Sequence, residues 1–179
     1  MAFSARYKGR EQAIADLFAA TFTDAEGAEE GALIGDLARR LMTGTPARDL
    51  RVFTAGTGER PAGAILFSRL AYGGPPRAVF VLGPVAVATE RQGEGIGTRL
   101  IGHGLEALRT EGVDIALTYG DPAFYGRLGF GPVSERDIPA PYPLQHPEGW
   151  LGQSLTAAGL SPLPGPARCV PAFADPVYW

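Results

Sequence analysis

Three glycines at alternate positions form the part of the sequence best suited to chemistry. Gly93, Gly95 and Gly97 stand between a β-type run, VAVA, and a helical pattern that begins TRLIGHG. Glycine lets the backbone approach an anion and point successive N–H groups at it, and a helix N-terminus adds partial positive charge. The loop therefore suits a phosphate or pyrophosphate, with Arg91 and Arg99 adding side-chain charge on either side. A tight turn that only needs positive φ would explain the same spacing.

Neither standard phosphate-binding motif fits this loop. A dinucleotide-binding G-x-G-x-x-G motif would need its third glycine at Thr98 or Leu100. A nucleoside-triphosphate loop would end in Gly-Lys followed by Ser or Thr, and no lysine follows these glycines. The loop therefore predicts an anion site of another kind.

The loop resembles the acyl-coenzyme A loop of the GNAT superfamily of N-acetyltransferases. That loop reads Gln or Arg, two residues, Gly, one residue, then Gly or Ala, and Gln92, Gly95 and Gly97 match it. A second family block is a short helix whose Tyr is followed five residues on by the Phe of a Gly-Phe pair. Tyr125 and Phe130 in DPAFYGRLGF match this block. The two blocks occur in the family order, and the resemblance covers residues 50–133.

The resemblance implies an α/β (α+β) fold, with a mixed, mostly antiparallel central sheet in which two parallel strands splay apart, flanked by helices. Acetyl-CoA would be the cosubstrate. Its pantetheine would pair with the backbone of residues 85–87, and its pyrophosphate with the amides of residues 92–98. The N–H of Val87 would stabilise the oxyanion that forms at the thioester. The implied cofactor-binding residues are Val85, Ala86, Val87, Arg91, Gln92, Gly93, Glu94, Gly95, Ile96, Gly97, Thr98 and Tyr125.

The resemblance also gives Tyr125 the role of a general acid that protonates the departing thiolate. A thiol has an ordinary pKa of about 8.5, so the thiolate is already a fair leaving group and this hydrogen bond adjusts the rate. The alternative interpretation of Tyr125 is an aromatic ring that packs the short helix against the sheet.

No general base is evident. Some family members carry a Glu on the strand before the glycine loop, and Val81 occupies that place here. An alkylammonium with a pKa of about 10.4 must lose a proton before its nitrogen can attack. The base would come from elsewhere in the chain or from a water held by backbone carbonyls. A less basic amine would need no base.

One group of candidate acceptor-site residues lies in residues 21–31, which we expect to form a loop between two helices. In the GNAT fold this loop overhangs the acceptor site, although a solvated loop is the plainer interpretation of its charges. Its acids are Asp24, Glu26, Glu29 and Glu30, of which Asp24 and Glu26 are the acceptor-site candidates.

The other candidates lie in the tail segment PYPLQHPEGW. Tyr142 and His146, together with Trp150, would line the bottom of an acceptor pocket, and histidine has a suitable pKa for a base. The alternative interpretation of His146 is a surface histidine. We expect His103 to be exposed on its helix. Cys169 resembles a buried strand residue without a partner that would activate it.

Hydrophobic periodicity predicts the elements that position these residues. Two amphipathic helices open the chain, a β-meander follows, and a helix separates the meander from a further strand, which makes that strand parallel to its predecessor. The expected elements are helices near 13–20 and 33–41, strands within 50–56, 62–74 and 78–88, a helix at 98–112, a strand at 113–120, a short helix at 121–128 and a strand from 129.

Composition excludes several classes of protein. The net charge is −3, the pI is near 5.4 and no basic block is present, which argues against nucleic-acid binding. One cysteine and two histidines make a metal site improbable. No apolar run reaches the roughly 18 residues that would span a bilayer, and the first residues lack the apolar core of a signal peptide. We therefore expect a cytoplasmic protein without a membrane partner.

The length predicts a single domain over residues 1–179, with a core at about 1–136. In the remaining segment, 137–179, charges are sparse, and 10 of the 16 prolines lie from Pro132 onward. We expect this segment to wrap onto the domain as loop and edge strand. Its aromatic end, VYW, would suit packing against a second subunit in a homodimer.

The resemblance carried by the glycine loop and by Tyr125 and Phe130 implies an N-acetyltransferase that would move an acetyl group directly from acetyl-CoA to the amine of a small molecule or peptide. The alternative function is a coenzyme A-binding module of the same fold without catalytic activity. That alternative rests on the missing acid at Val81.

Overall fold

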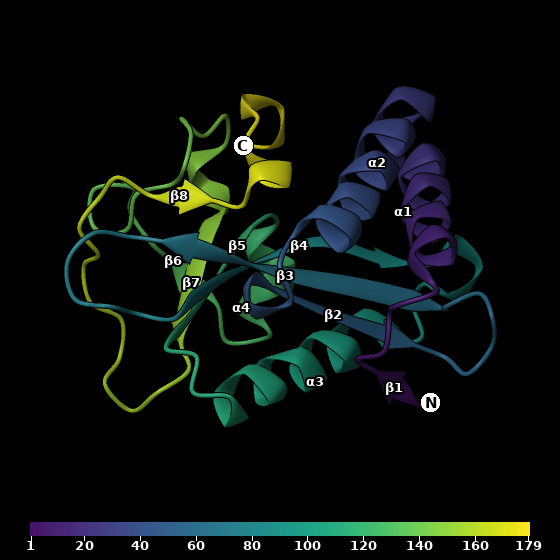
Figure 1. Cartoon of the computed structure of the whole chain (residues 1–179), viewed down its shortest axis with the longest axis horizontal. Coiled ribbons are helices and arrows are strands. Elements are labelled where there is room, and N and C mark those ends of the chain that lie inside the picture. Colours follow the sequence, from purple (N-terminus) through teal and green to yellow (C-terminus); the bar gives the residue numbers. More distant parts are fainter. The chain divides into compact units, whose positions relative to one another are not determined.

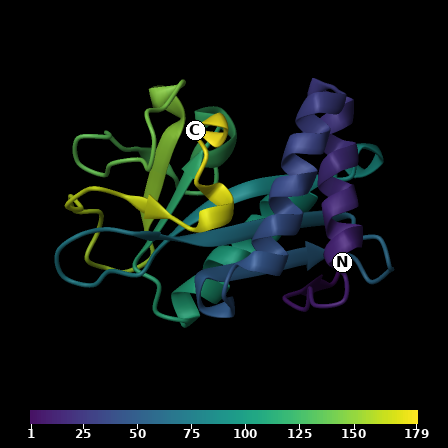
Figure 2. The same cartoon turned by 45° about the horizontal axis from the view of Figure 1, so that its top comes forward.

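Two helices that lie side by side follow a short strand at the start of the chain (Figures 1 and 2). They are α1 (Glu11–Glu26) and α2 (Ala28–Gly44) in the computed structural model, which describes all 179 residues. Gly31 and Gly35 allow the close approach. A Cβ atom at Gly31 would overlap the Thr23 side chain, and one at Gly35 would lie 2.8 Å from the Cβ of Ala19.

The expectation of a loop over residues 21–31 is wrong. α1 continues to its end at Glu26 and α2 begins two residues later, so Gly27 alone separates them. Its φ of 102° lies in the region that favours glycine, which lets the chain reverse within one residue. The acids of this segment are therefore helical, in the last turn of α1 and the first turn of α2: Asp24, Glu26, Glu29 and Glu30.

The β-type runs form a mixed sheet of eight strands in the order β1-β2-β3-β4-β5-β7-β6, with β8 paired to β3. Most of the pairing is antiparallel, and β4 and β5 are parallel, as expected for strands with a helix between them. The predicted fold class is confirmed. The strands are β1 (Phe3–Ser4), β2 (Leu50–Ala55), β3 (Gly63–Ala71), β4 (Val79–Val87), β5 (Ile115–Tyr119), β6 (Gly131–Pro132), β7 (Trp150–Ser154) and β8 (Arg168–Cys169).

Two further helices follow the glycine loop and β5, as the sequence predicts. α3 (Ile96–Thr110) begins at the end of the loop, and Gly112 follows it with a φ of 81°. α4 (Pro122–Gly126) is capped by Asp121, whose carboxylate accepts a hydrogen bond from the Ala123 amide at 2.9 Å. Short 3-10 turns lie at Ala47–Asp49, Thr89–Arg91, Pro147–Gly149, Pro171–Phe173 and Pro176–Tyr178.

By their internal contacts the residues divide into two compact units. The first, Met1–Phe67 with Gly83–Gly104, holds the helix pair, the glycine loop and a core that includes Phe18 and Leu41. The second, Ser68–Leu82 with Leu105–Trp179, holds α4, strands β5 to β8 and a core that includes Phe80 and Trp150. The assignment of all 179 residues to one domain stays a prediction.

The tail contributes an interior strand, where the sequence predicts only loop and edge strand. β7 pairs with β5 on one side and with β6 on the other. Gly152 permits this, because a Cβ atom there would lie 2.8 Å from the Leu117 side chain. Trp150 is fully buried, and its Nε1 donates to the carbonyl oxygen of Ile138 at 2.8 Å. The tail is thus part of the second core.

Candidate functional site

The glycine loop connects β4 to α3, where the sequence places it. Gly93 (φ 83°) and Gly95 (φ 72°) take left-handed backbone conformations, whereas Gly97 lies inside α3. A Cβ atom at Gly93 or Gly95 would meet no atom within 4 Å. Glycine is therefore needed at these two positions for the turn of the backbone and not for space.

The start of α3 presents N–H groups to a ligand. The Arg99 amide donates to the Gly95 carbonyl at 3.2 Å, which begins the helical hydrogen-bond pattern. The amides of Ile96, Gly97 and Thr98 precede that bond, so they have no acceptor within the helix. Since the helix dipole also favours negative charge at this end, the loop has the features that a phosphate group requires.

Charged side chains hold the loop in this shape. Arg91 makes a two-point ion pair with Glu94, with N···O distances of 2.7 and 2.8 Å. Arg99 donates to the carbonyl oxygens of Gly95 and Glu94 at 3.3 and 3.1 Å. The hydrogen bond from Arg91 lowers the pKa of the Glu94 carboxyl. Glu94 is therefore ionised at neutral pH and places a negative charge beside the proposed anion site.

The motif residue Gln92 ties the loop to the end of β4. Its Nε2 donates to the carbonyl oxygen of Val87 at 3.1 Å, and the Thr21 hydroxyl of α1 donates to the same oxygen at 3.3 Å. β4 pairs with β5 from Val79 to Leu82, and β4 itself continues to Val87. Both the loop and α1 are thus anchored at the last residue of β4.

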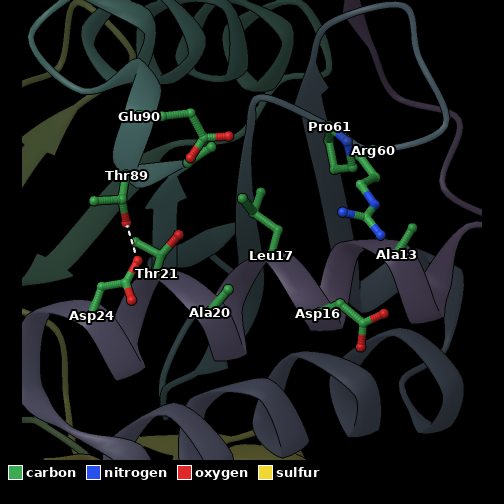
Figure 3. Close-up of a pocket in the computed structure, with 11 residues that line it drawn as sticks. Ala13, Asp16, Leu17, Ala20, Thr21, Asp24, Arg60, Pro61, Thr89 and Glu90 are labelled. Atoms are coloured by element: carbon green, nitrogen blue, oxygen red, sulfur yellow. Dashed lines mark hydrogen bonds between the residues drawn. The ribbon is translucent and has the colours of Figure 1, made fainter.

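A cavity of about 310 Å³ lies in the first unit between α1, the connection from β2 to β3, and the segment after β4 (Figure 3). Asp24, one of the acceptor-site residues that the sequence suggests, lines this cavity. Its Oδ2 accepts a hydrogen bond from the Thr89 hydroxyl at 2.7 Å. Glu26, the other acid proposed from α1, is exposed and outside the cavity wall.

Tyr125 lies on α4 in the second unit, with its ring fixed by neighbours. Phe124 and Phe130 contact it edge to face, at centroid distances of 5.0 and 5.8 Å. Any side chain at Gly120 would displace it, because a Cβ atom there would lie 2.6 Å from the Tyr125 ring. Burial raises the pKa of Tyr125, and a hydrogen bond with Thr118 opposes that shift. The phenol therefore keeps its proton at neutral pH, as a general acid must.

His146 lines a cavity of about 350 Å³ in the second unit, together with Tyr119, Asp121 and Glu148. The Nδ1 of His146 lies 3.5 Å from a carboxylate oxygen of Glu148, and its backbone N–H donates to the Tyr119 hydroxyl at 2.7 Å. Tyr142 is outside the wall of this cavity.

The remaining candidates have structural surroundings. Val81 is in the core, with 2% of its surface exposed. His103 is exposed, as expected, and its ring packs against Phe3 and Phe53 at centroid distances of 5.2 and 5.6 Å. Cys169 is half-buried in β8, and burial raises the pKa of its thiol, which keeps it unreactive. No cluster of three or more His, Cys, Asp or Glu side chains is placed to bind a metal ion, and none of the helices could cross a bilayer.

Sequence reasoning missed several residues of these sites. Arg60 and Glu90 line the first cavity from segments that look like ordinary turns, and Thr21 reads as one more residue of an expected loop. Thr118 is a polar residue within an apolar run, and this contrast could have marked it as a candidate hydrogen-bonding residue. Its buried hydroxyl donates to the Leu82 carbonyl at 3.0 Å as well as contacting Tyr125.

Comparison with known proteins finds the same family from sequence and from structure. A model of the acetyltransferase (GNAT) domain matches residues 6–133. The uncharacterized N-acetyltransferase YjhQ of Escherichia coli K12 is 37% identical over 146 residues, which cover 79% of this chain and 78% of YjhQ. A GNAT family acetyltransferase from Brucella melitensis, crystallised with acetyl-CoA, is similar in structure at 26% identity and a TM-score of 0.73, covering 96% of this chain and 97% of that one. The Escherichia coli YhbS structure with CoA has the same fold, at 23% identity and a TM-score of 0.78, covering 97% of this chain and 92% of YhbS.

Proposed function

The chain belongs to the GNAT family of acetyltransferases, and we propose that it transfers the acetyl group of acetyl-CoA directly to an amine of a small molecule or peptide. The glycine loop is the observation that carries this proposal. It combines two left-handed glycines, the amides at the start of α3 and the anchoring of Gln92 to β4. The similar protein from Brucella melitensis was crystallised with acetyl-CoA, which supports the same donor here.

In this proposal the backbone binds most of the donor. The amides from Gln92 to Thr98 bind the pyrophosphate, aided by the dipole of α3. The loop fits that group, because the positions of Gly93 and Gly95 face open space. The backbone of residues 85–87 pairs with the pantetheine, and the N–H of Val87 contacts the thioester oxygen. Arg91 contributes positive charge at the edge of the loop.

The proposed reaction is a direct aminolysis of the thioester. The amine nitrogen attacks the carbonyl carbon, the C–N bond forms and the C–S bond breaks. The oxyanion that develops on the carbonyl oxygen is stabilised by the N–H of Val87. One protonated amine and one acetyl-CoA give one N-acetylamine, one CoA thiol and one proton.

Tyr125 supplies the proton for the departing thiolate and regains one from water. Its raised pKa keeps the phenol protonated, and the contacts with Phe124, Phe130 and Gly120 fix the ring. This role comes from the family motif, and the surroundings of the ring are consistent with it.

No carboxylate on β4 acts as a base in this proposal, because Val81 takes that place in the core. The reaction then draws on the fraction of amine that is already unprotonated. Below the pKa of the amine, that fraction rises about tenfold per pH unit.

Calorimetric titration with acetyl-CoA tests the proposal. We expect saturable binding that inorganic pyrophosphate weakens by competition for the loop. The absence of acetyl-CoA binding at millimolar concentration would refute it. Binding without acetyl transfer to any amine would instead identify a coenzyme A-binding module.

A further inference from the structure

The cavity in the first unit adjoins the residue proposed to contact the thioester. Thr21 lines the cavity and donates to the Val87 carbonyl at 3.3 Å, and Ala88, the next residue, lines it as well. A ligand in the cavity therefore lies beside the end of β4. The volume of about 310 Å³ is at the small end of the range for ligand sites, which suits a small molecule.

One end of the cavity is acidic. Figure 3 shows Asp24, Thr89 and Glu90 together at this end, from α1 and from the segment after β4. The Thr89 hydroxyl donates a hydrogen bond to Oδ2 of Asp24, so Oδ1 can accept one from a ligand. The Glu90 carboxylate forms no hydrogen bond or salt bridge, and the neighbouring Arg91, which interacts with it electrostatically, is paired with Glu94. No cation lines this end, so an ammonium group, with three N–H donors, complements it in charge and in hydrogen bonding.

The rest of the cavity carries little net charge. Leu17 and Ala20 lie between the two ends, and Asp16 and Arg60, of opposite sign, lie at the far end (Figure 3). Asp16 and Asp24 are eight residues apart on α1, which corresponds to about 12 Å along the helix. The charges at the far end are therefore well separated from the ammonium site, with apolar surface between.

We propose that this cavity binds the acceptor, and that the acceptor is a primary amine with an apolar body and no carboxylate beside the amine. The inference rests on the proposed function and names its substrate class. In a free α-amino acid the carboxylate is only two bonds from the nitrogen, so it would face Asp24 and Glu90. Each like-charge contact at about 4 Å weakens binding about fivefold even in water. Two such contacts predict discrimination of roughly thirtyfold against α-amino acids.

A matched set of ligands tests the discrimination. 3-Methylbutylamine and leucine differ only in the carboxylate, and leucinamide replaces that charge with a neutral group of similar size. Binding of each is measured by calorimetry, to the free protein and to its CoA complex. We expect 3-methylbutylamine and leucinamide to bind with similar affinity and leucine at least tenfold more weakly, as the repulsion requires.

Variants test the place of binding. Asp24→Asn keeps an oxygen that can accept from Thr89 while removing the charge, and Glu90→Gln does the same at the neighbouring acid. Each is expected to raise the Kd and the KM for 3-methylbutylamine about fivefold, leaving the Kd for CoA unchanged. Glu59→Gln is the control, because Glu59 precedes Arg60 in sequence but is outside the cavity wall.

The results distinguish a failure of the cavity assignment from a failure of the proposed acetyl transfer. Equal binding of leucine and 3-methylbutylamine, or amine binding that neither variant changes, would overturn the assignment of this cavity. Acetylation of leucine as fast as of 3-methylbutylamine would do the same. A chain that binds the amines as expected but binds no acetyl-CoA would refute the proposed function alone.

Discussion

Two glycine-to-alanine substitutions, only seven residues apart in the chain, should have opposite effects. Gly95 has a φ of 72° in the loop, whereas Gly102 is exposed within α3. A Cβ atom meets nothing within 4 Å at either position, so neither change creates a steric clash. The difference between the two variants therefore isolates the backbone conformation.

For Gly95→Ala the cost is that of a left-handed alanine, about 1 to 2 kcal/mol. In a chain of this size, that corresponds to a Tm lower by about 2 to 8 °C. If the loop relaxes to negative φ instead, stability is retained and the amides no longer converge on the pyrophosphate. Affinity for acetyl-CoA then falls by about fivefold to thirtyfold, because the same free energy is lost on binding.

For Gly102→Ala we expect a gain of about 0.5 to 1 kcal/mol from helix propensity and an unchanged affinity for acetyl-CoA. Thermal unfolding and calorimetric titration on both variants and the wild type make the comparison. A Gly95→Ala protein as stable as the wild type, with the same affinity for acetyl-CoA, would refute the role given to this glycine.

Three further predictions concern charge and protonation. Glu94→Gln removes the negative charge from the loop and should lower the Kd for CoA roughly twofold to fivefold at low salt, with a smaller effect at high salt. A higher Kd would mean that the ion pair between Glu94 and Arg91 is needed for the shape of the loop. Tyr125→Phe should lower kcat by about a hundredfold, the lower end of what a general acid contributes, and leave the KM for acetyl-CoA unchanged. Because the pKa of Tyr125 is raised, the wild-type rate should not fall as the pH rises from about 8 to 10. An unchanged kcat would remove Tyr125 as the acid. Burial also raises the pKa of Tyr72. Above pH about 10 the unfolded chain loses protons that the folded chain keeps at Tyr72 and Tyr125, so the free energy of unfolding should fall by about 1.4 kcal/mol per pH unit for each tyrosine. Urea unfolding at pH values on both sides of 10, with Tyr72→Phe for comparison, measures this, and a constant midpoint would contradict it.

The local parts of the fold could be predicted from the sequence. The glycine loop, α3 and the capped start of α4 depend on short-range spacing and on residues such as Asp121, whose preferences act within one turn. The loop expected around Gly27 was wrong because a single glycine reversed the chain, and propensity alone does not distinguish one turn residue from several. The interior position of β7 depends on contacts with β5 and β6, which no local pattern encodes.

The candidate sites, like the fold, contain a part that the sequence predicts and a part that it does not. Gln92 and Tyr125 were recognisable because they belong to compact motifs. The cavity was not recognisable, because Asp24, Arg60 and Glu90 come from separate segments and line one cavity only after α1 packs against the end of β4. Thr21 joins α1 to the Val87 carbonyl by a hydrogen bond, and no local pattern in the sequence marks it for that contact.

The most direct test of acetyl transfer is to incubate the protein with acetyl-CoA and 3-methylbutylamine. In the same sample, the acetylated amine is measured by mass spectrometry and the free CoA thiol by the absorbance of a thiol-reactive dye. We predict equal amounts of N-acetylamine and CoA thiol, both formed faster as the pH approaches the pKa of the amine. Thiol release without acetylated amine, or no consumption of acetyl-CoA with any primary amine, would contradict the proposed function.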